Sequence, residues 1–160
     1  MIYLLDTNAV IAIMAGDEGL LGLLKRHAPK DFALSAIVVH ELYYGAEKSQ
    51  RRAQNLARIE ALQFAVLEFD RDDARHAGEI RAGLATLGTP IGPYDALIGG
   101  QARARNLTLI TRNMREFERI SGNLSASRVS STKRGNGLTR KAPPSCPSAA
   151  SPRRRARHGW

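Results

Sequence analysis

The sequence contains one cysteine, Cys146, and this scarcity excludes two kinds of small protein. A single thiol can form neither an internal disulfide framework nor a cysteine-rich zinc site. Such cysteine usage is typical of a reducing compartment, so we expect a cytoplasmic protein. The N-terminal apolar run lacks a basic leader and is interrupted at Asp6 and Asn8, so we expect no signal peptide. No segment approaches the roughly 18 consecutive apolar residues of a membrane-spanning helix, and we expect no membrane association.

Acidic residues are absent from the last quarter of the chain. Residues 1–120 carry 15 Lys or Arg and 15 Asp or Glu, whereas residues 121–160 carry 9 basic residues and no acidic one. The net charge of +9 is therefore concentrated in the C-terminal quarter and is no evidence that the rest binds nucleic acid. We predict one folded domain over residues 1–120, or to about 129 if "LSASRV" adds an edge strand. Residues 130–160 are rich in Ser, Pro and Arg, which predicts a disordered basic tail.

The glycine loops that bind nucleotides are also missing, since neither G-x-G-x-x-G nor G-x-x-x-x-G-K-[ST] occurs. What the chain does contain is short apolar segments alternating with helical patterns. The patterns predict strands over residues 2–5, 31–35, 65–69 and 107–111, and helices over residues 7–15, 19–27, 36–49, 51–64, 71–88, 91–106 and 112–120. This alternation predicts an α/β fold with a mostly parallel sheet. Ligands of such sheets bind at the C-terminal ends of the strands.

Asp6 interrupts the apolar stretch "LLDTNAVI" at the end of the first predicted strand. One interpretation is that Asp6 caps the helix that follows, a common role for Asp. The other is that Asp6 belongs to a functional site, because a buried carboxylate needs a partner or a metal ion. This stretch alone leaves both interpretations open.

Glu41 lies four residues after Ile37 and three after Val38 in "AIVVHELYYG", on their side of a predicted helix. A glutamate on a core-facing helix surface is unusual unless it is paired. A buried salt bridge to an arginine is the structural alternative to a functional role.

Asp95 lies in the first turn of the helix predicted from "GPYDALIGGQA". A favourable interaction with the helix dipole is the simplest explanation. However, Asp95 shares a helix face with Ile98, Gly99 and Ala102, which should pack inward. The Gly99–Gly100 pair lowers helix propensity by roughly 1 kcal/mol per glycine, which indicates a need for close packing.

Thr111 and Asn113 follow the fourth predicted strand, where an ordinary polar turn is the alternative explanation. Together with Asp6, Glu41 and Asp95, they can meet at one edge of the sheet. Clustered carboxylates repel each other unless a cation neutralises them, and oxygen ligands favour Mg²⁺ or Mn²⁺. Such a site can hold a hydrated divalent ion against a phosphate and activate water for in-line attack.

Four motifs occur in the order of a known family: "YLLDTNAVI", "LSAIVVHELYYGAEKS", "GTPIGPYDALIGGQARARN" and "LTLITRNMREFERI". With them the chain resembles, over residues 1–120, the PIN-domain ribonucleases and specifically VapC-type toxins of type II toxin–antitoxin systems. The resemblance implies a three-layer α/β/α sandwich and a Mg²⁺- or Mn²⁺-dependent endoribonuclease that hydrolyses RNA phosphodiester bonds. It also implies a homodimer and a cognate VapB-type antitoxin that covers the site, with DNA contacted only through the antitoxin.

The same resemblance assigns roles to the site residues. The catalytic acids are Asp6, Glu41 and Asp95, with Asp6 and Asp95 as the main metal ligands. Glu41 is expected to bind the metal or its water and to orient the attacking hydroxide. Supporting hydrogen bonds are expected from Thr7, Asn8, Thr111 and Asn113.

Asn113 departs from the family pattern, in which the fourth position is often acidic. An amide adds no charge, so we expect a single metal ion, or a second one recruited with the substrate. Glu116 is a nearby carboxylate that can contribute. Asn113 also keeps open an alternative function, a catalytically silent PIN-like module that acts through antitoxin or RNA binding. A structure-specific DNA nuclease is a third possibility, disfavoured by the small size of the chain.

The basic tail lies beyond the resemblance. One hypothesis is a cationic arm that adds nonspecific, salt-dependent affinity for RNA. The interpretation we favour is a shifted reading frame or readthrough after a lost stop codon, because Ser/Pro/Arg/Ala-rich sequence is typical of GC-rich DNA translated in the wrong frame.

Overall fold

The computed structural model of the chain describes residues 1–123 and 128–130, so residues 131–160 of the predicted tail lie outside it. The strands are β1 (Tyr3–Leu5), β2 (Phe32–Ser35), β3 (Ala65–Leu67), β4 (Thr108–Ile110) and β5 (Arg128–Ser130). The helices are α1 (Thr7–Met14), α2 (Glu18–Arg26), α3 (Ala36–Glu47), α4 (Arg52–Glu60), α5 (Arg71–Thr86), α6 (Pro93–Ala104) and α7 (Met114–Asn123), with a 3₁₀ turn η1 (Pro29–Asp31).

The strands form one parallel sheet in the order β3-β2-β1-β4-β5. Leu4 in the central strand β1 is in register with Ala33 of β2 and Leu109 of β4. β5 pairs with β4 as an edge strand, and its residues Arg128–Ser130 overlap the segment "LSASRV" from which the sequence predicts one. Because all strands run in one direction, their C-terminal ends share one edge of the sheet, with the end of β1 in its middle.

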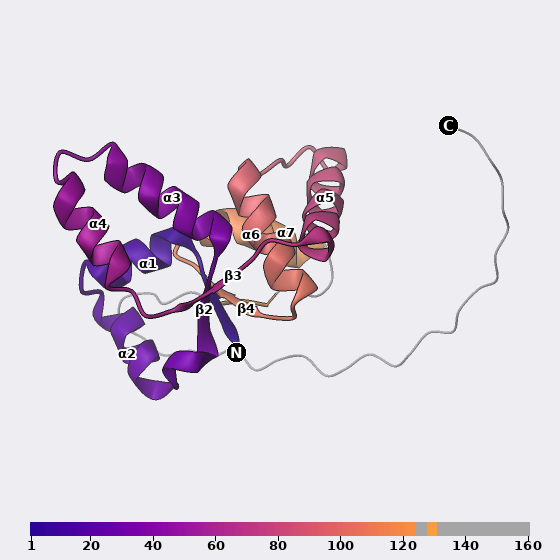
Figure 1. Cartoon of the computed structure of the whole chain (residues 1–160). Helices are drawn as coiled ribbons and strands as arrows, with labels where there is room; N and C mark the ends of the chain where they lie inside the picture. The colour runs from indigo at the N-terminus through magenta and orange to yellow at the C-terminus, as the bar shows by residue number, and fades with distance from the viewer. Residues whose placement is uncertain (124–127, 131–160) are drawn as a thin grey trace, which may run out of the picture.

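Helices cover both faces of the sheet, which confirms the predicted α/β/α sandwich. Figure 1 shows α1, α2, α3 and α4 on one side and α5, α6 and α7 on the other. The strands are only three or four residues long, yet the side chains of β1, β2 and β4 are the centre of the core, with Leu4, Leu5 and Phe32 fully buried. Burial on both faces explains why these three strands are largely apolar in the sequence.

Two glycines let α6 pack closely against its neighbours. A Cβ on Gly100 would lie 2.5 Å from the backbone nitrogen of Ala77 in α5. A Cβ on Gly99 would lie 2.6 Å from the Cδ1 atom of Ile120 in α7. The close packing predicted from this glycine pair is therefore present, and it sets how near α6 lies to α5.

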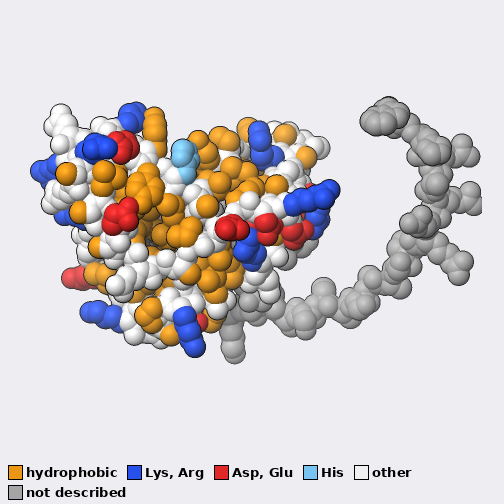
Figure 2. Space-filling view, in the orientation of Figure 1, with side chains coloured by type: hydrophobic (Ala, Val, Ile, Leu, Met, Phe, Trp, Pro, Cys, Tyr) orange, Lys and Arg blue, Asp and Glu red, His pale blue; other side chains and the backbone are white. Residues whose placement is uncertain are grey.

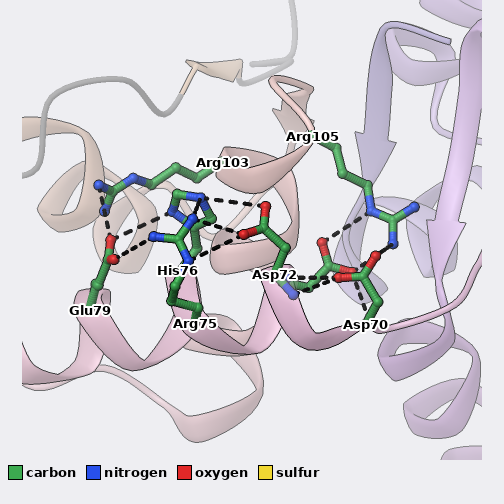
Figure 3. A network of polar contacts seen from close by, with 8 residues as sticks. Asp70, Asp72, Arg75, His76, Glu79, Arg103 and Arg105 are labelled. Atoms are coloured by element: carbon green, nitrogen blue, oxygen red, sulfur yellow. Dashed lines mark hydrogen bonds and ion pairs between the residues drawn. The ribbon is translucent and has the colours of Figure 1, made fainter.

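Polar contacts fix α6 to α5 at the ends of these helices (Figure 3). The fully buried Asp73 accepts hydrogen bonds from Arg105 at 3.0 and 2.7 Å and from Gln101 at 2.9 Å. Farther along, Arg103 of α6 lies 3.3 Å from Glu79 of α5. A buried carboxylate paired in this way resists sliding of one helix along the other, so the position of α6 is well defined.

In the described part of the chain, no single helix has the length and apolar character needed to cross a membrane. The pair α1 and α2 reaches those limits only when taken together, and its two helices meet at 99°.

Candidate active site

Asp6 lies where β1 ends and α1 begins, and it is only 3% exposed. Its Oδ1 atom accepts a hydrogen bond of 2.6 Å from the backbone N–H of Ala9, which makes Asp6 the N-cap of α1. The hydroxyl of Thr111, just after β4, donates to Oδ2 of Asp6. Asp6 therefore does cap the helix, as one interpretation of the sequence holds. The same side chain also lies at the C-terminal edge of the sheet, so the two interpretations are compatible.

Glu41 is half-buried on α3, on the helix face of the buried Val38, as its spacing predicts. The hydroxyl of Thr7, in the first turn of α1, donates to Oε2 of Glu41 at 2.5 Å. No Lys or Arg of the described residues forms an ion pair with Glu41, so the salt-bridge alternative finds no support. The Thr7 contact brings α3 and the start of α1 together next to Asp6.

Asp95 is half-buried in the first turn of α6, which begins at Pro93. Its face of the helix continues inward through Ile98, as the sequence predicts. A Cβ on Gly92 would lie 2.9 Å from Oδ2 of Asp95, so the absence of a side chain at Gly92 makes room for this carboxylate.

The carboxyl groups are close enough to perturb each other. The pKa of Asp6 is raised to about 6, mainly by burial and to a smaller extent by the charges of Asp95 and Glu41, although hydrogen bonds from Thr111 and Ala9 oppose the shift. The pKa of Asp95 is also raised, first by burial and then by the charges of Glu41 and Glu116. Ionising the acids together is thus unfavourable in the protein alone.

This donor set fits a hard divalent cation by its chemistry. All the candidate ligands are carboxylate oxygens, and a cation between them would offset the repulsion that raises their pKa values. Among the described residues, however, no three carboxylates, histidines or cysteines already converge as a metal cluster. The fit therefore lies in the type and charge of the donors, and a bound ion would draw them closer together.

The other predicted site residues differ in whether their side chains make contacts at the acids. Thr111 is buried, and its hydroxyl accepts a hydrogen bond of 2.8 Å from the backbone N–H of Asn113. Asn113 thus supports the site through its backbone. Asn8 is exposed on α1, and no side-chain hydrogen bond of Asn8 is found in the described part of the chain. Glu116 lies 3.2 Å from Arg119, which places a positive charge beside this carboxylate.

Two aromatic residues at the site went unrecognised in the sequence. Tyr94 and His40 lie in edge-to-face contact, with ring centroids 5.7 Å apart, planes at 65° and the Tyr94 hydroxyl 3.4 Å from Nε2 of His40. Each directly precedes a predicted acid, Asp95 or Glu41. That adjacency was the available signal, but only the packing of α3 against α6 shows that the two rings meet.

Known proteins with similar sequence and structure identify the family. The family model described as PIN domain matches residues 3–123. The chain is 42% identical over 122 residues to a tRNA(fMet)-specific endonuclease VapC from Salmonella typhimurium, covering 75% of this chain and 92% of that protein. It is 40% identical over 121 residues to ribonuclease VapC2 from Haemophilus influenzae, covering 74% of this chain and 91% of the relative.

A solved structure, that of DNA-bound VapBC from Salmonella typhimurium, superposes with a TM-score of 0.76 at 38% identity, covering 83% of this chain and 99% of that chain. The site residues Asp6, Glu41 and Asp95 all lie within the matched range. The chain therefore belongs to the PIN-domain family, among its VapC-type toxin endoribonucleases.

Proposed function

We propose that this chain cleaves RNA with the help of Mg²⁺, or of Mn²⁺ in its place, at the carboxylates of Asp6, Glu41 and Asp95. The observation that carries the proposal is that Asp6, Glu41 and Asp95 come from three separate segments, yet lie near enough at one sheet edge for the charges of Asp95 and Glu41 to add to the effect of burial on the pKa of Asp6. PIN-domain VapC nucleases are metal-dependent, and the oxygen-only donor set favours Mg²⁺ or Mn²⁺ over zinc.

Each acid has a distinct part in the proposed reaction. Asp6 and Asp95 would hold the cation, which when bound would supply positive charge beside the scissile phosphate and favour ionisation of the attacking water. Glu41 would accept a hydrogen bond from that water and orient it for in-line attack. Thr7 and Thr111 hold the carboxylates of Glu41 and Asp6 by the hydrogen bonds described above.

The substrate and the partner of this chain are also proposals. A relative is named as specific for tRNA(fMet), so transfer RNA is the first substrate class to test. The superposed structure is a VapBC complex, which supports a VapB-type antitoxin as partner and contact with DNA through that antitoxin. We further propose that the toxin is a homodimer, as the family resemblance implies.

A cleavage assay with paired substrates tests the nuclease and its metal. Purified full-length protein is incubated with a transfer RNA and with DNA of the same sequence, in Mg²⁺ and in EDTA. We expect cleavage of the RNA alone, only with the metal, and a loss of at least about 100-fold in Glu41→Gln. Glu118→Gln, at an exposed position of α7, is the matched control and should cleave normally.

Two results would contradict the proposal. Cleavage that persists in EDTA would exclude the metal-dependent mechanism. A folded, antitoxin-free protein that cleaves no RNA in Mg²⁺ or Mn²⁺ would favour the catalytically silent module, with Asn113 as the first position to examine.

A further inference from the structure

Beside the acids, exposed aromatic side chains continue in a line from α6 onto α3. Tyr94 of α6 contacts His40 of α3, and both side chains are exposed, Tyr94 by 43%. Tyr44 follows His40 on α3 and is 59% exposed. Lys48 comes next, with Nζ 3.2 Å from the Tyr44 hydroxyl and 5.1 Å from the centre of its ring. We refer to Tyr94, His40, Tyr44 and Lys48 as the aromatic track.

The spacing of the track follows from the helix. His40 and Tyr44 are four residues apart on one face of α3, and Lys48, four residues farther on, is the C-cap of this helix, so successive side chains are separated by about 6 Å along the helix axis. Figure 2 shows a histidine among hydrophobic side chains above α3 and α6, with basic side chains farther along α3. The track therefore begins at the acids and ends in positive charge.

The charges beside the track suit an anionic chain. Lys48 forms no ion pair within the described residues, so its ammonium can accept a new anionic partner. The neighbouring Glu47 is paired with Arg52 at 2.5 Å, which offsets a carboxylate that would otherwise repel phosphate. Exposed rings followed by an available cation are the combination that binds single-stranded nucleic acid, by stacking of bases and contact with phosphates.

We propose that the aromatic track binds the single-stranded part of the RNA next to the scissile bond. One base stacks on the His40–Tyr94 pair, the next base stacks on Tyr44, and Lys48 contacts a backbone phosphate beyond it. This inference rests on the proposed function, because it assumes that RNA lies across Glu41 and Asp95. Each of these acids directly follows a track residue, so RNA held by the track also lies beside the acids.

Binding of an uncleavable RNA tests the track without relying on catalysis. The probe is a short single-stranded RNA with 2′-O-methyl groups and 2-aminopurine at each position in turn, titrated with full-length protein in EDTA. We expect quenching of 2-aminopurine at stacked positions, and affinity about tenfold weaker in His40→Ala and in Tyr44→Ala. Tyr44→Phe keeps the ring face and should retain most of the affinity.

Matched controls lie on the same helix and on the opposite end of the sheet. Tyr43→Ala removes a tyrosine from another face of α3, where its hydroxyl donates to Glu60, and should leave RNA affinity unchanged. Lys48→Ala should reduce the salt dependence of binding by about 0.7 in the log–log slope, one phosphate contact. Lys30→Ala, in the 3₁₀ turn before the N-terminal end of β2, should leave the slope unchanged.

The cleavage kinetics separate failure of the track from failure of the nuclease. If Tyr44 binds RNA away from the reacting atoms, its replacement by alanine raises KM for a cleavable RNA while kcat is retained. Wild-type cleavage combined with equal affinities in wild type, Tyr44→Ala and Tyr43→Ala would overturn the track and leave the nuclease standing. A loss of neutralisation by a VapB-type antitoxin in Tyr44→Ala, with RNA affinity intact, would also overturn it and assign this surface to a protein partner.

Discussion

Asp6 is a buried carboxyl group whose ionised form is destabilised by its surroundings. Its pKa of about 6 reflects burial first and the nearby acids second. The sequence could reveal this residue, because Asp6 interrupts an apolar run at a strand end. The sequence could also reveal Glu41 and Asp95, because both lie on inward-facing sides of predicted helices. The sequence could not predict the contact between His40 and Tyr94, because these residues are 54 positions apart and their contact depends on how two helices pack.

Replacing Asp6 by Asn should stabilise the metal-free protein at neutral pH. Because the pKa of Asp6 is about 6 in the folded protein against an ordinary 3.8, the folded state binds more protons between these values. Stability therefore falls as pH rises through this window, by at most about 3 kcal/mol, and the full cost applies above pH 6. In EDTA at pH 7.5, urea unfolding should show Asp6→Asn more stable than wild type by about 1–3 kcal/mol.

The pH series supplies the internal control for this prediction. Well below pH 3.8 the Asp6 carboxyl is neutral in both the folded and the unfolded state, so the difference between Asp6→Asn and wild type should vanish. Asparagine is also a good N-cap, so the start of α1 is retained. An Asp6→Asn protein less stable than wild type at pH 7.5 would show that capping by the carboxylate outweighs the cost of burying it.

Gly92 tests whether the position of the Asp95 carboxylate matters. The added methyl group of Gly92→Ala meets only the flexible end of Asp95, so we expect this side chain to rotate and the fold to persist. Displacement of a reacting group by about 1 Å can cost about 100-fold in rate, so kcat should fall by at least tenfold. Tm should fall by only a few degrees. Gly45→Ala, on α3 with nothing within 4 Å of the new Cβ, should cleave normally.

At the scale of helices and strands, local pattern predicted most of the elements and the topology class. The alternation of apolar strands and helical segments predicted the parallel sheet that the structure shows, in which Ser35 is the N-cap of α3. The helix expected to run to residue 64 ends instead at Glu60, because the chain must become extended before β3. The 3₁₀ turn over Pro29–Asp31 was missed, since a single short turn has no periodic pattern.

The close approach of α5 and α6 should depend on Gly100. A methyl group in Gly100→Ala would meet the backbone of Ala77, which cannot move aside without separating the helices. We expect a loss of about 1–3 kcal/mol in the free energy of unfolding, measured by urea denaturation. Gly78→Ala, at an exposed position of α5 with open space around the new Cβ, should instead increase the free energy of unfolding by up to about 1 kcal/mol. Equal stabilisation in both variants would show that the two helices are free to separate.

At the scale of the whole molecule, the three layers bring segments distant in sequence to one sheet edge. The central position of β1 places Asp6 between the ends of β2 and β4, from which α3 and the Thr111 turn continue. The sequence could indicate which residues lie at that edge, because strand ends in a parallel sheet are on the same side. It could not give the strand order or the distances between carboxylates. The domain boundary near residue 120 to 129 and the cytoplasmic location remain predictions.

Removing residues 131–160 should leave the nuclease intact, because β5 and the acids lie outside this segment. The truncated chain lacks 8 of the 24 Lys and Arg residues of the full-length protein. If these residues formed an arm that binds RNA, the truncated protein would bind RNA more weakly than the full-length protein at low salt. We expect the full-length and truncated proteins to cleave RNA at equal rates at about 50 and 200 mM salt, because a tail that takes no part in binding or cleavage leaves the rate unchanged. A rate that drops on truncation only at low salt would support the cationic arm instead.

Cleavage of total bacterial RNA tests the central claim most directly. Purified, antitoxin-free protein is compared with Asp6→Asn and Asp95→Asn, first in Mg²⁺ and then in EDTA, and circular dichroism checks that each is folded. The account predicts discrete RNA fragments from wild type in Mg²⁺ alone and none from either variant. Fragments that persist in EDTA, or in a folded Asp6→Asn or Asp95→Asn protein, would contradict a metal-dependent nuclease built on these carboxylates.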